Sequence, residues 1–191
     1  MQSPIDLTTN LTTPAADGAR RLSVSYHHLS HLTTEDAGWT VTAVAEPGGV
    51  IGIDGTQYSL SEIHCHTPSE HTIDGVGADL EAHFVHQAVS EEIAVVGVMF
   101  DPAPGSHPID MVLTSGPQIE PIRLSDLVPF RAPQFSYVGS LTTPPFTDNV
   151  RWVVLTERLP VGVEALTEFA DRYGPNNRPV QPTGSESISY G

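Results

Sequence analysis

The segment from residue 62 to residue 86 begins with Glu62-Ile63-His64-Cys65-His66 and ends with Glu81-Ala82-His83-Phe84-Val85-His86. Two histidines at positions i and i+2 lie on the same face of a β-strand, whereas in a helix they lie on opposite sides. The β-branched and aromatic residues around these histidines favour strands. If residues 58–66 and 79–86 form neighbouring strands, the side chains of His64, His66 and His83 converge on one point.

Three converging imidazoles with an open fourth position are the ligand set of a catalytic zinc site. Glu81 precedes His83 by two residues, so its carboxylate lies on the same face and can accept the second ring N–H of a ligand histidine. However, most His-x-His pairs in proteins are hydrogen-bonded or surface histidines. The spacing therefore leaves a metal site and an ordinary polar cluster both open. Cys65 has the opposite parity and is expected in the core.

The 191 residues are expected to form a single domain, residues 1–191. No apolar run approaches the ~20 residues that span a membrane. The formal charge of -15 argues against nucleic acids and anionic membranes as partners, because both are polyanions. The start, residues 1–4, does not resemble a signal peptide. We expect a cytoplasmic protein if Met1 is native, and a periplasmic or secreted one if the sequence is a mature form. The sequence does not indicate an oligomeric state.

The 16 glycines and 17 prolines are spread along the chain, as in a protein of many short strands joined by turns. Residues 93–100 form the most apolar run and predict a central strand buried on both faces. Residues 163–173 have the periodicity of an amphipathic helix. Residues 27–31 are polar and are expected to form a solvated loop, and residues 183–191 a loosely ordered tail.

Several motifs, spread in order over nearly the whole chain, resemble those of the α-class carbonic anhydrases. They are residues 2–6 (QSPID), 22–26 (LSVSY), 69–72 (SEHT), 93–97 (IAVVG), 137–145 (YVGSLTTPP), Trp152 and 177–182 (NRPVQP), together with the histidine segment. The chain is similar to a compact, bacterial-like member of that family. The resemblance implies a mainly β fold, with a large twisted, mostly antiparallel central sheet of about ten strands and short peripheral helices.

The resemblance also implies an activity, the zinc-dependent reversible hydration of carbon dioxide to bicarbonate and a proton by a zinc-bound hydroxide. Its substrate is a small molecule and its cofactor is Zn²⁺. The metal ligands would be His64, His66 and His83. The catalytic pair would be Thr142, which accepts a hydrogen bond from the hydroxide, and Glu70, which accepts one from Thr142. Residues that support the ligands would be Glu62, Glu81 and Asn176, and the substrate pocket would comprise Val85, Val95, Leu141, Thr143 and Trp152.

Without zinc, the apolar pocket residues would be ordinary core residues, and Thr142 and Thr143 would simply shape a turn. His71 is expected to be a buried hydrogen-bonding residue and not a fourth ligand. By their position in the chain, neither His86 nor His107 is expected to take part.

The chain departs from the family pattern at three places. Glu62 stands where the family usually has Gln, which adds negative charge beside the metal and is expected to raise the pKa of bound water. Ala37 aligns with the usual proton-shuttling histidine, so proton export is expected to be slow and dependent on buffer. The usual N-terminal segment is absent, and Thr67-Pro68 replaces a usual Trp-Gly pair, so a wider pocket is expected. A zinc enzyme repurposed for another electrophile, by ester hydrolysis or a biosynthetic step, and a non-catalytic binding module are the alternatives.

Overall fold

The computed structural model describes residues 1–9, 13–14, 22–26, 29–46, 48–114, 119–184 and 187–191. Within these residues, thirteen strands form one large sheet. In chain order they are β2 (Thr13–Pro14), β3 (Ser23–Ser25), β4 (Leu29–Asp36), β5 (Val41–Glu46), β6 (Val50–Ile53), β7 (Thr56–His66), β9 (Leu80–Ala88), β10 (Ile93–Ala103), β11 (Ile119–Arg123), β12 (Gln134–Ser140), β13 (Asp148–Leu155), β14 (Leu159–Gly162) and β15 (Ser189–Tyr190).

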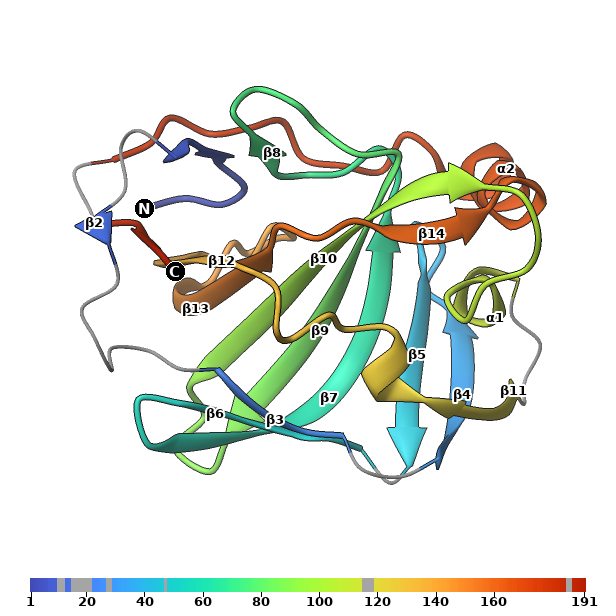
Figure 1. The fold of residues 1–191 in the computed structure, drawn as a ribbon, viewed down its shortest axis with the longest axis horizontal. Coiled ribbons are helices and arrows are strands. Elements are labelled where there is room, and N and C mark those ends of the chain that lie inside the picture. The colour runs from blue at the N-terminus through green and yellow to red at the C-terminus, as the bar shows by residue number, and fades with distance from the viewer. Residues whose placement is uncertain (10–12, 15–21, 27–28, 47, 115–118, 185–186) are drawn as a thin grey trace.

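The strands lie in the order β11–β4–β5–β7–β9–β10–β13–β12–β15–β2 (Figure 1), with β14 beside β10, β6 beside β7, and β3 beside β6. Parallel pairs occur at β10–β13, β10–β14 and β15–β2, and the other pairs in this sheet are antiparallel. The predicted mainly β architecture is therefore confirmed. The strand number exceeds about ten because β2, β3 and β15 have only two or three residues each.

A smaller sheet and three short helical segments complete the described fold. β1 (Asp6–Leu7) pairs with β8 (Thr72–Ile73) in parallel. The helices are α1 (Asp110–Leu113), α2 (Val163–Tyr173) and the 3₁₀ turn η2 (Leu124–Asp126). α2 has the boundaries that the apolar periodicity predicts. No helix among the described residues has the length and apolar character needed to cross a membrane.

β10 is the central strand of the sheet. Along one edge it pairs with β9, and along the other it pairs first with β13 through residues 94–97 and then with β14 through residues 100–103. Its residues 94–100 are all buried, which confirms the predicted strand with two covered faces. Alternate side chains of β10 enter different clusters: Val96 and Val98 pack with Phe84 and Cys65, whereas Val95 packs with Trp152 on the opposite face. Cys65 is thus a core residue, as its parity indicates.

The hairpin that leads into β7 sets the position of the first two histidines. Asp54 and Gly55 connect β6 to β7 with φ angles of 52° and 84°, the left-handed conformation typical of a two-residue hairpin turn. β7 then pairs with β9 in antiparallel register, with a shift between Leu60 and Glu62, so that His64 lies directly opposite His83. The predicted pairing of the two histidine-bearing segments is confirmed.

Two local predictions were wrong. Residues 29–31 belong to β4, where buried Ser30 alternates with exposed Leu29 and His31; residues 27–28 lie outside the described part of the chain. This strand has one solvated face, so its sequence is as polar as that of a loop. The C-terminal tail ends in β15, which pairs with β12 through Ser189 and Tyr190, and Ile188 is buried.

Candidate metal centre

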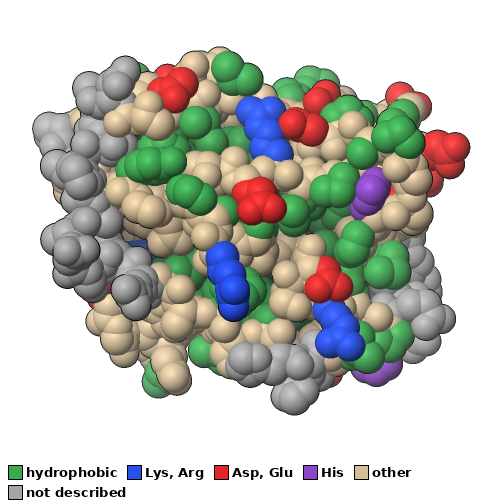
Figure 2. All heavy atoms as spheres, in the orientation of Figure 1, with side chains coloured by type: hydrophobic (Ala, Val, Ile, Leu, Met, Phe, Trp, Pro, Cys, Tyr) green, Lys and Arg blue, Asp and Glu red, His purple; other side chains and the backbone are tan. Residues whose placement is uncertain are grey.

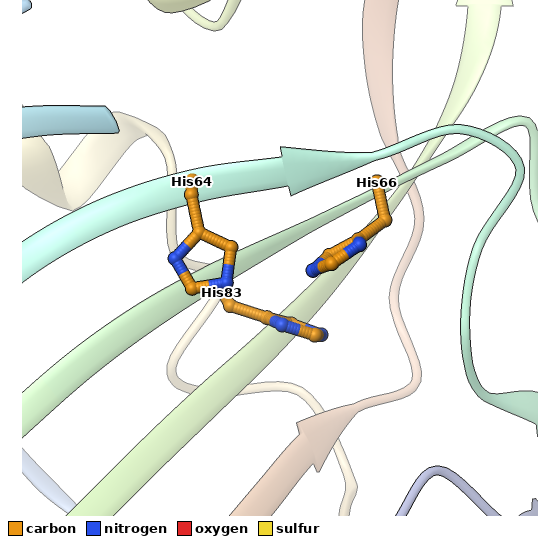
Figure 3. Close-up of side chains that lie close together, drawn as sticks. All are labelled: His64, His66 and His83. Atoms are coloured by element: carbon orange, nitrogen blue, oxygen red, sulfur yellow. The ribbon is translucent and has the colours of Figure 1, made fainter. Parts of the chain in front are cut away.

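His64, His66 and His83 form a compact cluster on one face of the sheet (Figure 3). Each offers one ring nitrogen, and these three atoms lie within 4.8 Å of one another. His64 is 7% exposed and the other two are 1% exposed. The cluster arises because β7 contributes two side chains of equal parity and β9 contributes the residue that faces the first of them.

The second nitrogen of each ring is held by a hydrogen-bond acceptor. His64 Nδ1 lies 3.0 Å from Glu62 Oε1, His66 Nδ1 lies 3.1 Å from the carbonyl oxygen of Asn176, and His83 Nε2 lies 3.0 Å from Glu81 Oε1. A ring nitrogen that faces a carboxylate or carbonyl oxygen carries the proton, so the other nitrogen keeps its lone pair. The unprotonated nitrogens are therefore Nε2 of His64, Nε2 of His66 and Nδ1 of His83.

The charge state of the cluster suits a metal ion. Burial lowers the pKa of His66 to about 3 and that of His83 to about 4, so both rings are neutral at pH 7. His66 Nε2 is buried and has no hydrogen-bond partner. A buried polar nitrogen without a partner is costly, and a cation would satisfy it. Three imidazoles whose ring nitrogens converge fit the nitrogen ligand set of Zn²⁺.

Glu81 is a fully buried carboxylate that organises this face of the sheet. Its Oε2 accepts the backbone N–H groups of Glu70 at 2.9 Å and His71 at 2.8 Å, and its Oε1 faces His71 Nδ1 at 2.7 Å as well as His83 Nε2. Burial alone would raise the pKa of the Glu81 carboxyl, but its interactions with the two histidines hold that pKa well below the usual range. Gly97 leaves room for the carboxylate, because a Cβ there would lie 2.9 Å from Oε1.

His71 does not present a free nitrogen to the cluster. Its Nδ1 is bonded to Glu81, and its Nε2 lies 2.7 Å from the hydroxyl of Tyr137, which in turn donates to Ser3 Oγ at 2.9 Å. The prediction of a buried hydrogen-bonding residue is confirmed. His86 is also buried, with its Nε2 bonded to the hydroxyl of Tyr26, and it lies outside the cluster.

Glu70 and Thr142 are both buried close to the sheet. Glu70 Oε1 accepts the backbone N–H of Arg178 at 2.7 Å. Glu70 Oε2 has no hydrogen-bond partner and lies 3.6 Å from His66 Nε2 and 3.9 Å from His83 Nδ1. The hydrogen bond expected from Thr142 to Glu70 is therefore not formed in this structure, although the carboxylate oxygen that would accept it is unpartnered.

Three of the five expected pocket residues lie in a row across the sheet, and the other two lie in a loop. Val85 of β9 pairs with Val95 of β10, which pairs with Trp152 of β13. Trp152 is 1% exposed, its ring centroid lies 4.9 Å from that of His83, and its indole N–H donates to the carbonyl of Ser140. Leu141 and Thr143, in the loop after β12, are half-buried, as is Val85.

Sequence reasoning missed two residues near this centre. The ring centroid of Trp39 lies 5.5 Å from that of His64 and 5.6 Å from that of His66, whereas Ala37 is an exposed residue between β4 and β5. Arg178 fixes Glu70 through its backbone, and its guanidinium donates to the carbonyl of Ser3 at 2.6 Å and lies over the ring of Phe146. Arg178 belongs to a motif already singled out at residues 177–182, but nothing local in the sequence indicated its partners.

A protein-family model described as eukaryotic-type carbonic anhydrase matches residues 1–190. A carbonic anhydrase of Nostoc sp. is 30% identical over 196 residues, covering 98% of this chain and 74% of that protein. The solved α-carbonic anhydrase of Photobacterium profundum is 34% identical, covers 98% of this chain and 88% of its own, and has a TM-score of 0.87. The α-carbonic anhydrase of Thermovibrio ammonificans, solved with the inhibitor sulfanilamide, is 32% identical over 98% of this chain and 86% of its own, with a TM-score of 0.85.

The residues matched by the family model begin before β1 and end in β15, the last strand of the large sheet. They include the three converging histidines. The predicted resemblance and the predicted enzyme class are both confirmed by this match. The chain accordingly belongs to the eukaryotic-type, or alpha, carbonic anhydrase family and is a carbonic anhydrase.

Proposed function

We propose that this enzyme catalyses the reversible hydration of carbon dioxide to bicarbonate and a proton, with Zn²⁺ held by His64, His66 and His83. The observation that carries the proposal is the set of three buried rings whose free nitrogens lie within 4.8 Å of one another. When bound, zinc supplies a hydroxide nucleophile near neutral pH by lowering the pKa of water, an effect for which carbonic anhydrases are themselves the standard example.

The supporting residues keep the three rings in the ligating tautomer. Glu62, Glu81 and the carbonyl of Asn176 each take the N–H that points away from the cluster. Glu81 is the most constrained of the three, because both of its oxygens are already shared with other donors. These contacts leave the rings little freedom to turn, which pre-organises the centre before any ligand arrives.

Thr142 and Glu70 are proposed to orient the nucleophile. The unpartnered Glu70 Oε2 is available as an acceptor for the Thr142 hydroxyl. A threonine that donates its only proton to this carboxylate can then only accept a hydrogen bond from the attacking oxygen, and so keeps a lone pair of that oxygen directed at the substrate carbon. The backbone N–H of Arg178 fixes the other oxygen of Glu70.

The apolar wall is proposed to bind carbon dioxide. Val95 and Trp152 are buried, while Val85, Leu141 and Thr143 are partly exposed. Carbon dioxide has no net dipole and no hydrogen-bond donor, so an apolar wall suits it. The chain has no lysine, and on the face shown in Figure 2 the described Arg side chains stand apart from one another and form no basic patch.

Proton export is proposed to depend on buffer. Ala37 has no acid–base group, and neither has Trp39, the exposed aromatic residue that lies against His64 and His66. General acid–base groups contribute roughly 10²- to 10⁴-fold to rates, so turnover in weak buffer should be slow and should rise when imidazole is added. A rate that does not change with imidazole concentration would show that another group exports the proton.

The decisive experiment pairs zinc stoichiometry with stopped-flow hydration of carbon dioxide in concentrated buffer. His83→Ala removes a proposed ligand, and His31→Ala removes an exposed histidine of β4 as the matched control. We expect one zinc per chain and hydration in the parent and the control, and loss of both in His83→Ala. Stoichiometric zinc without hydration would contradict the proposal and favour a repurposed zinc enzyme; no zinc at all would favour a binding module.

A further inference from the structure

Trp39 is held in place by the hairpin between β4 and β5, which are neighbours in Figure 1. Gly38 adopts a φ of +84°, and its N–H donates to Asp36 Oδ1 at 2.8 Å. Arg172 of α2 forms an ion pair with the same aspartate. From the other side, the side-chain amide of Asn176 donates to the carbonyl of Trp39 at 2.9 Å. The backbone of this tryptophan is thus anchored both by its own turn and by the residue that supports His66.

The indole lies between two ligand rings and solvent. Its contact with His64 is edge-to-face, with an interplanar angle of 70°, and its contact with His66 is tilted at 35°. Trp39 is 39% exposed, whereas the two histidines are almost fully buried. Trp152 lies against the third ring, His83, and belongs to the core. Two indoles therefore flank the cluster, one in the interior and one at the surface.

We propose that Trp39 is a specificity-determining residue: it closes the side of the centre over His64 and His66 and so restricts ligands there to small ones. The inference deepens the proposed function and rests on the same metal centre. The loss of the usual Trp-Gly pair at Thr67-Pro68 predicts a wider pocket, but the indole of Trp39 fills space beside His66 from another part of the sheet. A ligand with a bulky group on this side would have to displace an anchored aromatic ring, which discriminates against it by steric clash.

The test uses alkyl hydroxamates, in which one zinc-binding head carries groups of different size. Titration calorimetry on the zinc-loaded protein measures the Kd of acetohydroxamate and of pivalohydroxamate. The variants are Trp39→Ala and the milder Trp39→Leu, which keeps an apolar side chain if the alanine variant folds poorly. Phe130→Ala is the matched control, because Phe130 is also an exposed aromatic residue, at 38%, and lies in the loop before β12.

We expect Trp39→Ala to improve the binding of pivalohydroxamate relative to acetohydroxamate by roughly tenfold or more, with a smaller change for Trp39→Leu and none for Phe130→Ala. The relative kcat/KM for p-nitrophenyl pivalate and acetate should shift in the same direction. The inference would be overturned if the ratio of the two hydroxamate Kd values in both Trp39 variants stayed within about twofold of the parent ratio. Equal weakening of both hydroxamates would overturn it too, because it would mean that the indole only supports the histidine rings. The Kd ratio is measurable whether or not carbon dioxide is hydrated, so failure of the proposed function would be seen separately.

Discussion

Replacement of Glu81 by glutamine tests how the chain prepares His83 for a metal. The substitution exchanges one carboxylate oxygen for an NH₂ group in a side chain with no exposed surface. One oxygen of Glu81 accepts two backbone N–H groups, and the other faces nitrogens of His71 and His83. A peptide N–H can only donate, whereas an imidazole nitrogen can donate or accept according to its tautomer. In Glu81→Gln the amide oxygen should therefore face the backbone, and the NH₂ group should face the two rings.

This orientation forces His83 to accept a hydrogen bond at Nε2 and moves its proton to Nδ1, the nitrogen that the cluster uses. Loss of a partner that supports a metal ligand typically costs 10- to 100-fold in metal affinity, which is about 1.4 to 2.8 kcal/mol. The metal-free protein should lose stability too. The two hydrogen bonds from His71 and His83 lose their charged acceptor, and a hydrogen bond to a charged group contributes roughly 1.5–3 kcal/mol to stability. The total stability of a typical domain is only about 5–15 kcal/mol.

The assay is competition for zinc against a chromophoric chelator, together with denaturant unfolding of the metal-free protein. Glu62→Gln is the matched control. It makes the same chemical change beside His64, but the Glu62 side chain is 42% exposed, so glutamine can turn its oxygen to the ring and its NH₂ group to water. We expect Glu62→Gln to keep zinc affinity within about threefold of the parent. If Glu81→Gln bound zinc as tightly as Glu62→Gln, the tautomer argument would be refuted.

Three further predictions follow from burial and charge. Removing the negative charge beside His64 in Glu62→Gln should move the rise of activity with pH to lower pH, and an unchanged pH–rate profile would count against an electron-rich metal centre. Burial lowers the pKa of His86 from 6.5 to about 4, so the unfolded chain binds a proton that the folded chain excludes, and stability should fall as pH drops from about 6.5 to 4. His86 should contribute on the order of 3 kcal/mol to this loss, beside the contributions of His66 and His83, so the loss should be smaller by that amount in His86→Phe, as denaturant unfolding of the metal-free protein at a series of pH values would measure. Burial raises the pKa of Cys65, which is 1% exposed, so iodoacetamide should modify it only after unfolding; rapid labelling of the native protein, followed by mass spectrometry, would mean that β7 opens readily.

The cluster of histidines could be predicted because it depends on a local rule. Side-chain alternation places His64 and His66 on one face of β7, and a single antiparallel pairing brings His83 opposite the first of them. The same rule correctly assigned Cys65 to the other face. These relations hold for any two adjacent strands, so they needed no knowledge of the remaining sheet.

The remaining features depend on contacts between distant segments. Trp39 is read locally as the start of a strand, and only the position of β5 beside β7 brings it to the histidines. The β4 segment at residues 29–31 resembles a loop because its exposed face carries polar and apolar residues alike. The last strand, β15, has too few residues to show a period and is defined by its pairing with β12 and β2. The side-chain geometry of Thr142 and Glu70 is likewise a matter of rotamers that a motif does not specify.

The three histidines occupy one short stretch of the chain, whereas Thr142, Trp152 and Asn176 come from much later segments. During synthesis, the ribosome releases β7 and β9 well before β13, which carries Trp152, and the loops that carry Thr142 and Asn176. A nascent chain thus contains the three histidines of the proposed metal centre before it contains the other residues of that centre. Domains generally fold as units, so the proposed metal centre is complete only when these later segments have been made and have folded. Under the proposed function, tight binding of zinc is therefore expected only after the segment that carries Asn176, which holds His66, has left the ribosome.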